Sequence, residues 1–351
     1  MARSPTKGKS ATTAGAPKAL LPLPAMTTVV VPPLHTSGNE IIDANGQPVM
    51  LRGVVLEGLE MNATAPGVTQ EAVQTAKDWG ANIVRVPLGA QYWVLGNCEY
   101  DPAYAIVVND VVNWITSLGM IALLDLHYTS PTGCEDAGLH NMADENESPT
   151  FWKQVASKYA SNPLVAFELF NEPHNISDQL WLDGGTTTDA YGAPVTYEAA
   201  GMQQLYDTVR STGAGNLVFV GGTNWASTPP LLRVAGTNIV YVAHAWTCPN
   251  EPPPQCTTPN PYDPPPALAE WIAFSATEPV VVDEFGWPRP TDGQYNTNLI
   301  ADVQAHRMGW VAFQFEQVKN PNGYDLVYYP NGAPVPTASG QPVLNALKGP
   351  P

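Results

Sequence analysis

The chain has 351 residues, and its 32 acidic and 15 basic side chains give a formal net charge of −17. Charged residues make up only 13% of the chain, roughly half of the usual share in a soluble domain. The hydrophobic fraction of 44% is enough for a large core. An acidic chain with few cations cannot neutralise phosphate groups, so nucleic acids and anionic membrane surfaces are excluded as partners, and an uncharged substrate is favoured.

The first part of the chain differs from the rest in composition. It is rich in Ala, Thr and Pro, shows no periodicity, and contains basic residues but no acid before residue 40. We expect residues 1–37 to be a disordered leader or linker and residues 38–351 to form one folded domain. Pro22 and Pro24 interrupt the only early apolar stretch, so a secretory signal is not convincingly present. No apolar run approaches the roughly 18 residues of a membrane-spanning helix.

From residue 38 onward, short β-branched runs alternate with segments of helical period, which indicates repeated βα units. The turn signal Asn45–Gly46, between Glu40–Ile42 and Pro48–Leu51, predicts a β-hairpin that closes the bottom of the sheet. Strands are expected at Gly53–Leu56, Asn82–Pro87, Met120–His127, Val165–Asn171, Leu217–Gly221, Ile239–Ala245, Val280–Glu284 and Trp310–Phe315. Helices are expected at Thr69–Trp79, Ala103–Leu118, Thr150–Ala160, Glu198–Thr212, Leu231–Ala235, Ala267–Ser275, Asn296–Met308 and Pro342–Lys348. This order predicts an α/β fold, a (β/α)8 TIM barrel with an N-terminal β-hairpin and an active site at the C-terminal ends of its strands.

The ends of the predicted strands are unusually polar. These residues are Arg85, Asp125, His127, Asn171, Glu172, His244, Asp283 and Glu284. A single polar residue at such a position is ordinarily a hydrogen-bonded rim residue. Because the strand ends of a barrel converge on one face, polar residues at five of them favour a functional site.

Two of these residues, Glu172 and Glu284, have the chemistry that hydrolysis of a glycosidic bond requires. That reaction needs one protonated carboxyl group for the leaving oxygen and one ionised carboxylate for the anomeric carbon. Arg85 is the natural cation beside the ionised partner, and Asn171 could hydrogen-bond a sugar hydroxyl. The sequence contains no GxSxG elbow, HExxH motif or Walker A loop, and neither a metal nor a cofactor is expected.

Five motifs and the hairpin segment together resemble glycoside hydrolase family 5, the clan A retaining hydrolases that include many cellulases. The motifs are RVPLG (Arg85–Gly89), LDLHY (Leu124–Tyr128), LFNEPH (Leu169–His174), AHAW (Ala243–Trp246) and VVDEFGW (Val281–Trp287). The likeness runs from about residue 38 to residue 348 and covers all eight predicted strands. It implies that residues 38–351 are a glycoside hydrolase catalytic domain.

The resemblance also implies roles for single residues. Glu172 would be the general acid/base and Glu284 the nucleophile, with their carboxyl groups about 5–5.5 Å apart. Arg85 would contact the nucleophile, and Asn171 the sugar 2-hydroxyl. His127 and His244 would hydrogen-bond sugar or catalytic carboxylates.

Two positions differ from the family pattern. Trp246 stands where the family usually has a Tyr that touches the nucleophile, and its indole can donate but not accept a hydrogen bond. Phe313 stands where the family usually has the Trp that forms a sugar platform, with Phe315 as the other possible match. We therefore expect Trp246 and Phe313 to bind substrate beside the cleaved bond.

Tryptophans follow several of the predicted strands and suggest a sugar-binding cleft. They are Trp93, Trp181, Trp225, Trp246 and Trp287. An indole face stacks on the apolar C–H groups of a pyranose ring while its N–H edge stays hydrated. For any single one of these residues, plain loop packing explains the position equally well. The five together favour an extended cleft for a polymer.

Four cysteines, Cys98, Cys134, Cys248 and Cys256, show no CxxC spacing, so a zinc cluster is not expected. Their even number fits two disulfides, and Cys248 and Cys256 bracket a short Pro-rich loop. This arrangement favours pairing Cys248 with Cys256 and Cys98 with Cys134. The alternative is four free thiols in a cytosolic protein.

These observations lead to one main expectation and two alternatives. We expect a secreted, monomeric, retaining endo-β-1,4-glucanase that acts on β-linked polysaccharide or oligosaccharide. A β-mannanase or another β-glycan hydrolase is the alternative within the same class. A non-catalytic carbohydrate-binding barrel is the alternative from a different class.

Overall fold

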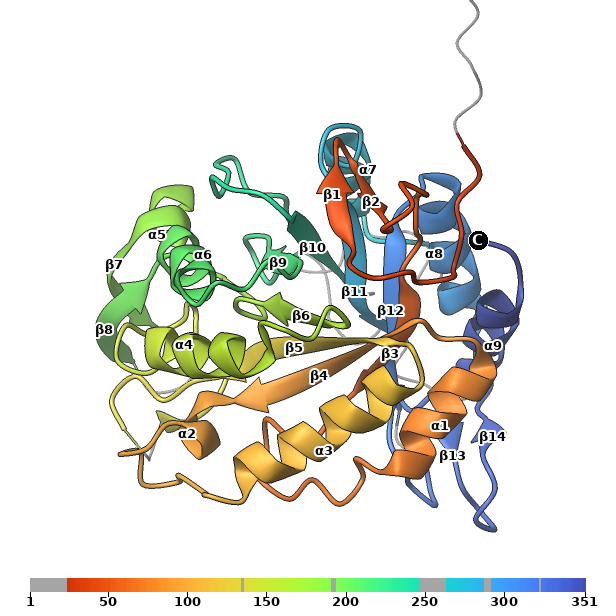
Figure 1. Ribbon diagram of the computed structural model, residues 1–351, viewed down its shortest axis with the longest axis horizontal. Helices are drawn as coiled ribbons and strands as arrows, with labels where there is room; N and C mark the ends of the chain where they lie inside the picture. The colour runs from red at the N-terminus through yellow and green to blue at the C-terminus, as the bar shows by residue number, and fades with distance from the viewer. Residues whose placement is uncertain (1–23, 134–135, 191–193, 247–262, 287–291, 322) are drawn as a thin grey trace, which may run out of the picture.

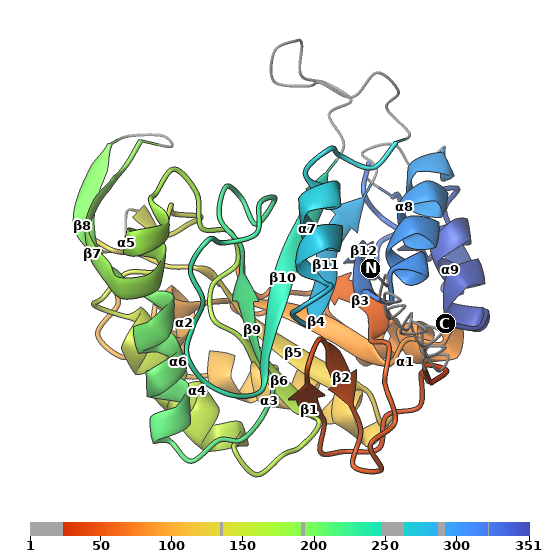
Figure 2. The same cartoon turned by 90° about the horizontal axis from the view of Figure 1, so that it is seen from above.

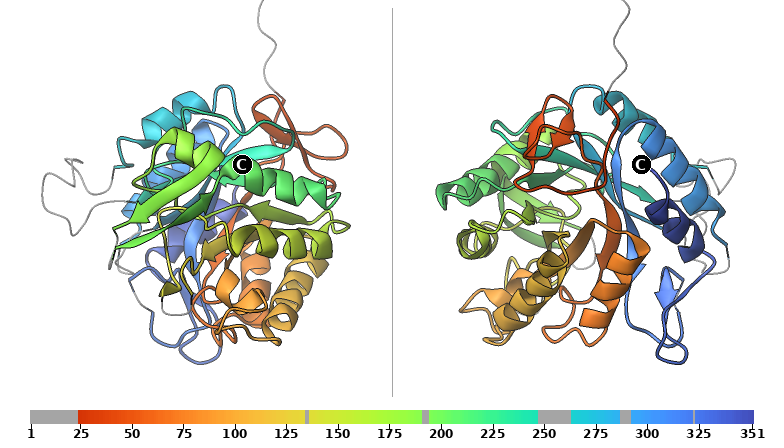
Figure 3. Two further views of the ribbon diagram at one scale, coloured as in Figure 1. Left: turned by 90° about the vertical axis from the view of Figure 1, so that its left-hand side faces the viewer. Right: turned by 45° about the vertical axis from the view of Figure 1, so that its right-hand side comes forward.

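The computed structural model describes residues 24–133, 136–190, 194–246, 263–286, 292–321 and 323–351. Eight parallel strands form a closed barrel in the order β10-β11-β12-β3-β4-β5-β6-β9. Helices surround these strands, with α1 and α3 on the opposite side of the barrel from α7 (Figures 1 and 3). The predicted (β/α)8 barrel is therefore confirmed.

The barrel strands agree closely with the eight predicted ones. They are β3 (Arg52–Leu56), β4 (Ile83–Gly89), β5 (Ile121–Tyr128), β6 (Val165–Glu168), β9 (Val218–Gly221), β10 (Ile239–Trp246), β11 (Val280–Gly286) and β12 (Gly309–Phe315). Nearly all of their residues are buried, because helices cover the outer face of the sheet and side chains fill the interior. Continuous apolar runs, rather than alternating ones, are the sequence signal of such strands.

The helices are α1 (Gln70–Trp79), α2 (Ala90–Trp93), α3 (Tyr104–Ser117), α4 (Ser148–Tyr159), α5 (Asp178–Asp183), α6 (Met202–Ser211), α7 (Leu268–Phe274), α8 (Gln294–Ala305) and α9 (Gly340–Lys348). The first of them shows how local sequence sets the bounds. The Thr69 side chain accepts a hydrogen bond from the Ala72 N–H at the start of α1, and Gly80 ends the helix with a φ of 104°.

Two groups of buried apolar residues hold the barrel together. The larger lies between the strands and the surrounding helices. The smaller contains Val55, Phe219 and Val281 from the barrel strands together with Leu34 and Ile41 from the N-terminal segment. The predicted N-terminal hairpin therefore closes the bottom of the barrel.

The hairpin is more extensive than predicted. β2 (Glu40–Ile42) pairs with β1 (His35–Ser37), and an isolated bridge joins Ile42 to Pro48 across the predicted Asn45–Gly46 turn. Residues 24–37, which the sequence assigns to the leader, thus contribute a strand and the buried Leu34 to the domain. The expected leader remains a prediction only for residues 1–23, which lie outside the described residues.

Three further elements differ from the prediction. Leu231–Ala235 is not helical, since Pro229, Pro230 and Gly236 flank this short segment, so no helix connects β9 to β10. The expected helix at Glu198–Thr212 begins only at Met202, because Glu198 belongs to a strand. That strand, β8 (Val195–Ala200), pairs with β7 (Gly184–Asp189) in an antiparallel hairpin. The hairpin lies on the far side of the molecule from α9 (Figures 1 and 2).

A small antiparallel pair, β13 (Val327–Tyr328) and β14 (Val335–Pro336), follows the last barrel strand. Within the described ranges, no helix combines the length and apolar character needed to cross a membrane.

Candidate active site

The predicted polar residues meet at the C-terminal ends of the barrel strands. Arg85 lies on β4, His127 on β5, His244 on β10 and Glu284 on β11, while Glu172 lies in the loop after β6. These five side chains join one continuous set of ion pairs and hydrogen bonds with Asp125, Glu168, Asn171 and Asp283. Residues that are widely separated in the sequence thus form a single buried polar cluster.

Arg85 occupies the centre of this cluster and is fully buried. Its Nε and Nη2 donate to the two carboxylate oxygens of Glu168 at 2.7 and 2.8 Å. It also donates to Glu284 Oε2 at 2.8 Å through Nη1 and to Asn171 Oδ1 at 2.7 Å through Nη2. Burial opposes the positive charge, but nearby carboxylates, Asp125 among them, raise the pKa of Arg85 well above its usual value.

Glu172 and His244 form a close pair. Nδ1 of His244 lies 2.7 Å from Oε1 of Glu172. Burial opposes ionisation of Glu172, but the hydrogen bond to His244 and the charge of that imidazole lower the pKa of Glu172. Burial also opposes a charge on His244, yet Glu284, Asp283 and Glu172 raise the pKa of His244 well above its usual value.

Glu284 receives hydrogen bonds on both of its carboxylate oxygens. Arg85 donates to Oε2, and the indole Nε1 of Trp246 donates to Oε1 at 3.2 Å. An oxygen of Glu172 and an oxygen of Glu284 lie within 4.8 Å of each other. The two carboxylates are therefore close neighbours in different surroundings, one paired with a histidine and the other with an arginine.

Two other predicted residues have partners that orient them. Nδ1 of His127 lies 2.7 Å from Oδ2 of Asp125. Burial opposes the charge on His127, but Asp125 outweighs it and raises the pKa of His127. Asn171 is held through its oxygen by Arg85, and among the described residues its buried Nδ2 has no hydrogen-bond acceptor.

Comparison with known proteins identifies the family. The model of the cellulase family, glycosyl hydrolase family 5, matches residues 42–318. The chain belongs to glycosyl hydrolase family 5. The matched segment contains all eight barrel strands and every residue of the buried polar cluster.

Curated relatives of this family 5 chain include two bacterial enzymes. The chain is 28% identical over 212 residues to cellulase CelDZ1 of Thermoanaerobacterium sp, and the aligned region covers 58% of this chain and 49% of the relative. It is 30% identical over 239 residues to endoglucanase MaCel5A of Microbulbifer sp. (strain ALW1), which covers 55% of this chain and 44% of the relative. The chain thus spans about half the length of these relatives.

Solved structures share the fold. The catalytic domain of Thermobifida fusca endoglucanase Cel5A matches with a TM-score of 0.65 at 20% identity, covering 90% of this chain and 97% of that one. The β-glucanase SdGluc5_26A of Saccharophagus degradans, solved with cellotetraose, matches with a TM-score of 0.67 at 19% identity, covering 93% and 97%. The fold of this family 5 chain is therefore that of known glucanase domains.

Not all of the predicted aromatic residues face the site. Trp93 on α2 is only 7% exposed, and its indole donates to Gln154 between helices. Trp181 on α5 is fully buried and donates to the carbonyl of Gly221. Both residues pack in the core of the family 5 domain, so their predicted role in sugar binding is wrong.

Other predicted aromatic residues do lie near the carboxylate of Glu284. Trp246 and Phe313 pack edge to face with a centroid distance of 5.4 Å. Phe315, the other possible match, is buried against Trp79. Trp225 is half-buried and stacks on His174 at 3.4 Å. Trp287, Cys134, Cys248 and Cys256 lie outside the described residues.

Sequence reasoning gave no role to three contributors to this face of the barrel. Glu168 and Asp283 contact Arg85; Glu168 had not been singled out, and Asp283 had been named only as a polar strand end. Tyr324, in the loop after β12, lies 5.4 Å from Trp246 and is 36% exposed. Strand alternation gives a signal for Glu168, but it gives none for a loop residue such as Tyr324.

Proposed function

We propose that this chain is a retaining endo-β-1,4-glucanase, with Glu172 as acid/base and Glu284 as nucleophile. The observation that carries this proposal is the proximity of the two carboxylates, whose oxygens lie within 4.8 Å. Retaining glycosidases hold their carboxyl groups about 5–5.5 Å apart, whereas inverting enzymes need roughly 6.5–9.5 Å to admit a water molecule. The described separation therefore supports double displacement.

In the first step Glu284 attacks the anomeric carbon, and the bond from that carbon to the leaving oxygen breaks. The electron pair stays on the leaving oxygen, which takes a proton from Glu172. In the second step Glu172 removes a proton from water, and the resulting oxygen displaces Glu284 from the sugar. Arg85 and Trp246 donate to Glu284 and so fix the direction in which its oxygens point.

Two polar contacts to the sugar complete the proposal. Asn171, one residue before Glu172, offers the free Nδ2–H group described above to a sugar hydroxyl. His127 is held at Nδ1 by Asp125, which leaves its second nitrogen for the substrate. Hydrogen bonds to the 2-hydroxyl that strengthen in the transition state add to catalysis in this class of enzyme.

A neutral β-glucan fits the remaining features. Trp246, Phe313 and Tyr324 form an aromatic group beside Glu284, and aromatic faces stack on pyranose rings. The names cellulase and endoglucanase of the relatives favour β-1,4-glucan over mannan, the alternative substrate. A non-catalytic sugar-binding barrel would not require the acid/base geometry.

The test is release of reducing ends from carboxymethylcellulose, barley glucan and mannan. We expect Glu172→Gln and Glu284→Gln each to lower the activity by at least about 1,000-fold, because each removes a group that reacts. Glu270→Gln, at an exposed position on α7, is the matched control and should retain full activity. Undiminished cleavage by both site variants would refute the mechanism. If the wild type cleaved mannan alone, mannan would replace glucan as the proposed substrate.

Azide separates the roles of the two carboxylates on an activated β-glycoside. Azide should restore turnover of Glu284→Gly and give an α-glycosyl azide, because it enters on the side that the nucleophile vacates. With Glu172→Ala it should give a β-glycosyl azide, because it then attacks the glycosyl-enzyme in place of water. The reversed pair of products would exchange the two assignments.

We also propose that the protein acts outside the cell as a monomer, with the disulfides Cys98–Cys134 and Cys248–Cys256. What supports a disulfide at Cys98 is the disulfide-bonded state of this residue, and disulfides persist in oxidising compartments. Peptide mapping without reduction should recover both linked pairs, whereas alkylated free thiols at these positions would contradict the proposal.

A further inference from the structure

Asp283, the residue before the proposed nucleophile, lies at an irregularity in strand pairing. β10 and β11 pair in parallel with Ala243 opposite Val282, but the next pair is His244 opposite Glu284. Asp283 is therefore an extra residue in β11. Successive side chains of a regular strand point to opposite faces, but a bulge re-aims one of them. As a result, Asp283 and Glu284 both reach the same imidazole, that of His244.

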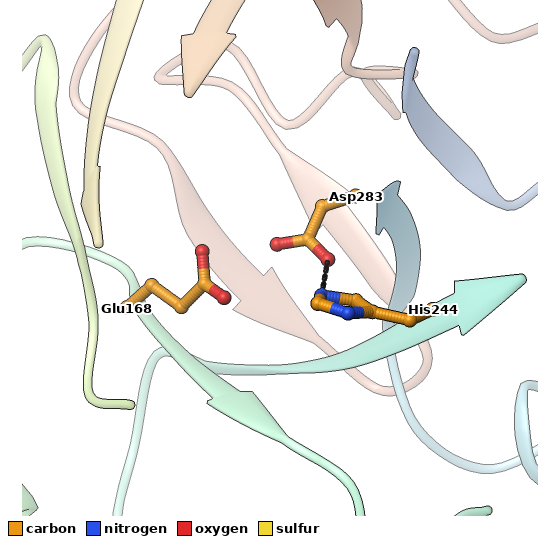
Figure 4. Close-up of side chains that lie close together, drawn as sticks. All are labelled: Glu168, His244 and Asp283. Carbon is orange, nitrogen blue, oxygen red and sulfur yellow. Dashed lines mark ion pairs between the residues drawn. The ribbon is translucent and has the colours of Figure 1, made fainter. Parts of the chain in front are cut away.

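The contact between Asp283 and His244 joins two buried groups that have few other partners. Nε2 of His244 lies 3.3 Å from Oδ1 of Asp283 (Figure 4). Both side chains are fully inaccessible to solvent. Among the described residues neither Nε2 of His244 nor either carboxylate oxygen of Asp283 has a hydrogen-bond partner, so the contact between them is an ion pair. Within the part of the chain that the structure describes, the only other cation near Asp283 is Arg85, whose Nε lies 3.5 Å from Oδ2 of Asp283. This Nε already donates a hydrogen bond to Glu168.

The opposite nitrogen of the same imidazole contacts the proposed acid/base, since Nδ1 lies 2.7 Å from Oε1 of Glu172. His244 therefore lies between two carboxylates, one on each ring nitrogen. The charged groups that face it are Glu168 from β6, Glu172 from the following loop, and Asp283 and Glu284 from β11. Arg85 from β4 donates hydrogen bonds to Glu168 and Glu284 and forms a longer ion pair, 3.5 Å, with Asp283.

We propose that Asp283 is a positioning residue for the acid/base: it keeps a proton on Nε2 of His244, so that Nδ1 exchanges the catalytic proton with Glu172. This inference rests on the proposed function, because it assigns Glu172 the task of protonating the leaving oxygen. It adds to that function an Asp–His–Glu chain in which Asp283 never touches the substrate.

The number of protons on Asp283, His244 and Glu172 is the same before and after the two steps. Before reaction the shared proton lies between Nδ1 and Oε1. As the glycosidic bond breaks, Glu172 delivers this proton to the leaving oxygen, which leaves Glu172 ionised and His244 neutral with its proton on Nε2. When water attacks the glycosyl-enzyme, Glu172 takes up the proton of the water, and the pair holds one shared proton again.

Without Asp283, the neutral imidazole could instead carry its proton on Nδ1. That tautomer has no lone pair toward Glu172 and cannot receive the proton in the second step. A buried carboxylate facing the other ring nitrogen is the usual way in which proteins select a histidine tautomer.

A metal ion is a poorer explanation for the same side chains. Glu168, His244 and Asp283 have ligand atoms within 4.8 Å of one another, and Figure 4 shows them converging from three strands. The guanidinium of Arg85, however, donates to both oxygens of Glu168. The carboxylate of Glu168 is thus already paired with a cation.

The test compares wild type, Asp283→Asn and the control Asp125→Asn on two aryl β-cellobiosides. 4-Nitrophenolate is a poorer leaving group than 2,4-dinitrophenolate, so its departure depends more on proton donation by the acid/base. Asp125 is the matched control because it also lies beside Arg85 and contacts a histidine, but that histidine is His127. The readout is kcat/KM as a function of pH for each substrate.

The direction of the expected pH shift follows from the negative charge of Asp283. Carboxylates hold the proton of the His244–Glu172 pair to higher pH, so removing the charge of Asp283 should move the basic limb of the profile to lower pH, by about one unit for a charge this close. The loss at neutral pH should be about tenfold for the 4-nitrophenyl substrate and small for the dinitrophenyl one. Asp125→Asn should leave the basic limb in place.

An unchanged basic limb in Asp283→Asn, or an equal loss on both substrates, would overturn the proposal. If Asp283→Asn fails to fold, the tautomer of His244 in the wild-type protein tests the proposal instead. The chain has six histidines, so 15N NMR can resolve them, and His244→Gln identifies the signal of interest. A protonated Nε2 from pH 5 to 8 supports the proposal, and an unprotonated Nε2 refutes it.

This NMR readout needs no substrate, so it separates the two proposals. If the wild type cleaved no β-glycan yet kept Nε2 protonated, the proposed function would be wrong while the Asp283–His244 contact stood. If the enzyme were active and Nε2 carried no proton, the proposed function would stand and the role of Asp283 would be wrong.

Discussion

At the residue scale, the chemistry of the site depends on carboxylates held in unlike surroundings. Glu172 faces a histidine, whereas Glu284 accepts from an arginine and an indole. The sequence predicts both residues, because each lies at a polar strand end. It places Asp283 among the polar strand ends but does not predict that Asp283 acts beside Glu284, because strand alternation assigns adjacent residues to opposite faces, and only the bulge in β11 brings both side chains to His244.

Another carboxylate with an unusual environment is Glu57, which follows β3 at the same end of the barrel. Burial, together with Glu60, raises the pKa of Glu57 to about 8. Such a group is protonated in the native state when the unfolded chain has already ionised. Its contribution to stability is complete below the unfolded pKa of 4.5 and is lost as the pH rises through about 8.

We therefore expect Glu57→Gln to unfold at a higher temperature than wild type at pH 8.5 or above, with a gain of roughly 2 kcal/mol in the free energy of unfolding. The two proteins should converge near pH 4. Glu99→Gln, at an exposed position, is the control and should follow the wild-type pH dependence. Parallel curves of melting temperature against pH for Glu57→Gln and wild type would contradict this account.

At the element scale, the barrel strands are the most predictable part of the fold. Their apolar β-branched runs are buried on both faces, so the sequence signal is strong. The β7–β8 hairpin escaped prediction because much of Gly184–Asp189 is Gly and Thr without an apolar run. The apolar residues of Leu231–Ala235 led to the expectation of a helix. The segment is not helical, because it is too short to form stable helical turns.

The packing between β3 and β4 leaves no room at Gly53. A Cβ added there would lie 1.8 Å from the carbonyl oxygen of Ile83. Because that atom belongs to the backbone of the neighbouring strand, it cannot move aside as a flexible side chain could.

Gly53→Ala should therefore destabilise the barrel by about 3 kcal/mol or more in urea unfolding, at the upper end of the cost of overpacking. The matched control is Gly215→Ala. A Cβ at Gly215 meets nothing within 4 Å, so this variant should stay within about 0.5 kcal/mol of wild type. Equal stability of the two variants would show that the β3–β4 contact is looser than described.

At the scale of the whole molecule, the composition agrees with the architecture. The whole chain has a net charge of −17, and its folded domain binds, in our proposal, an uncharged polymer. The alternation of strands and helices was enough to predict the closed barrel and the face on which the site lies. It could not reveal that residues 24–37 contribute β1 and Leu34 to the bottom of the barrel, because a three-residue strand leaves almost no periodic signal.

The separation of Glu172 and Glu284 decides the stereochemical course of the whole reaction, and so one measurement tests the central claim most directly. The anomeric proton of the sugar released from a cello-oligosaccharide can be followed by 1H NMR during the first minutes of hydrolysis, before mutarotation. Carboxylate oxygens within 4.8 Å predict that the β-anomer appears first and the α-anomer follows by mutarotation. Initial release of the α-anomer would mean inversion and would contradict the double displacement through Glu284.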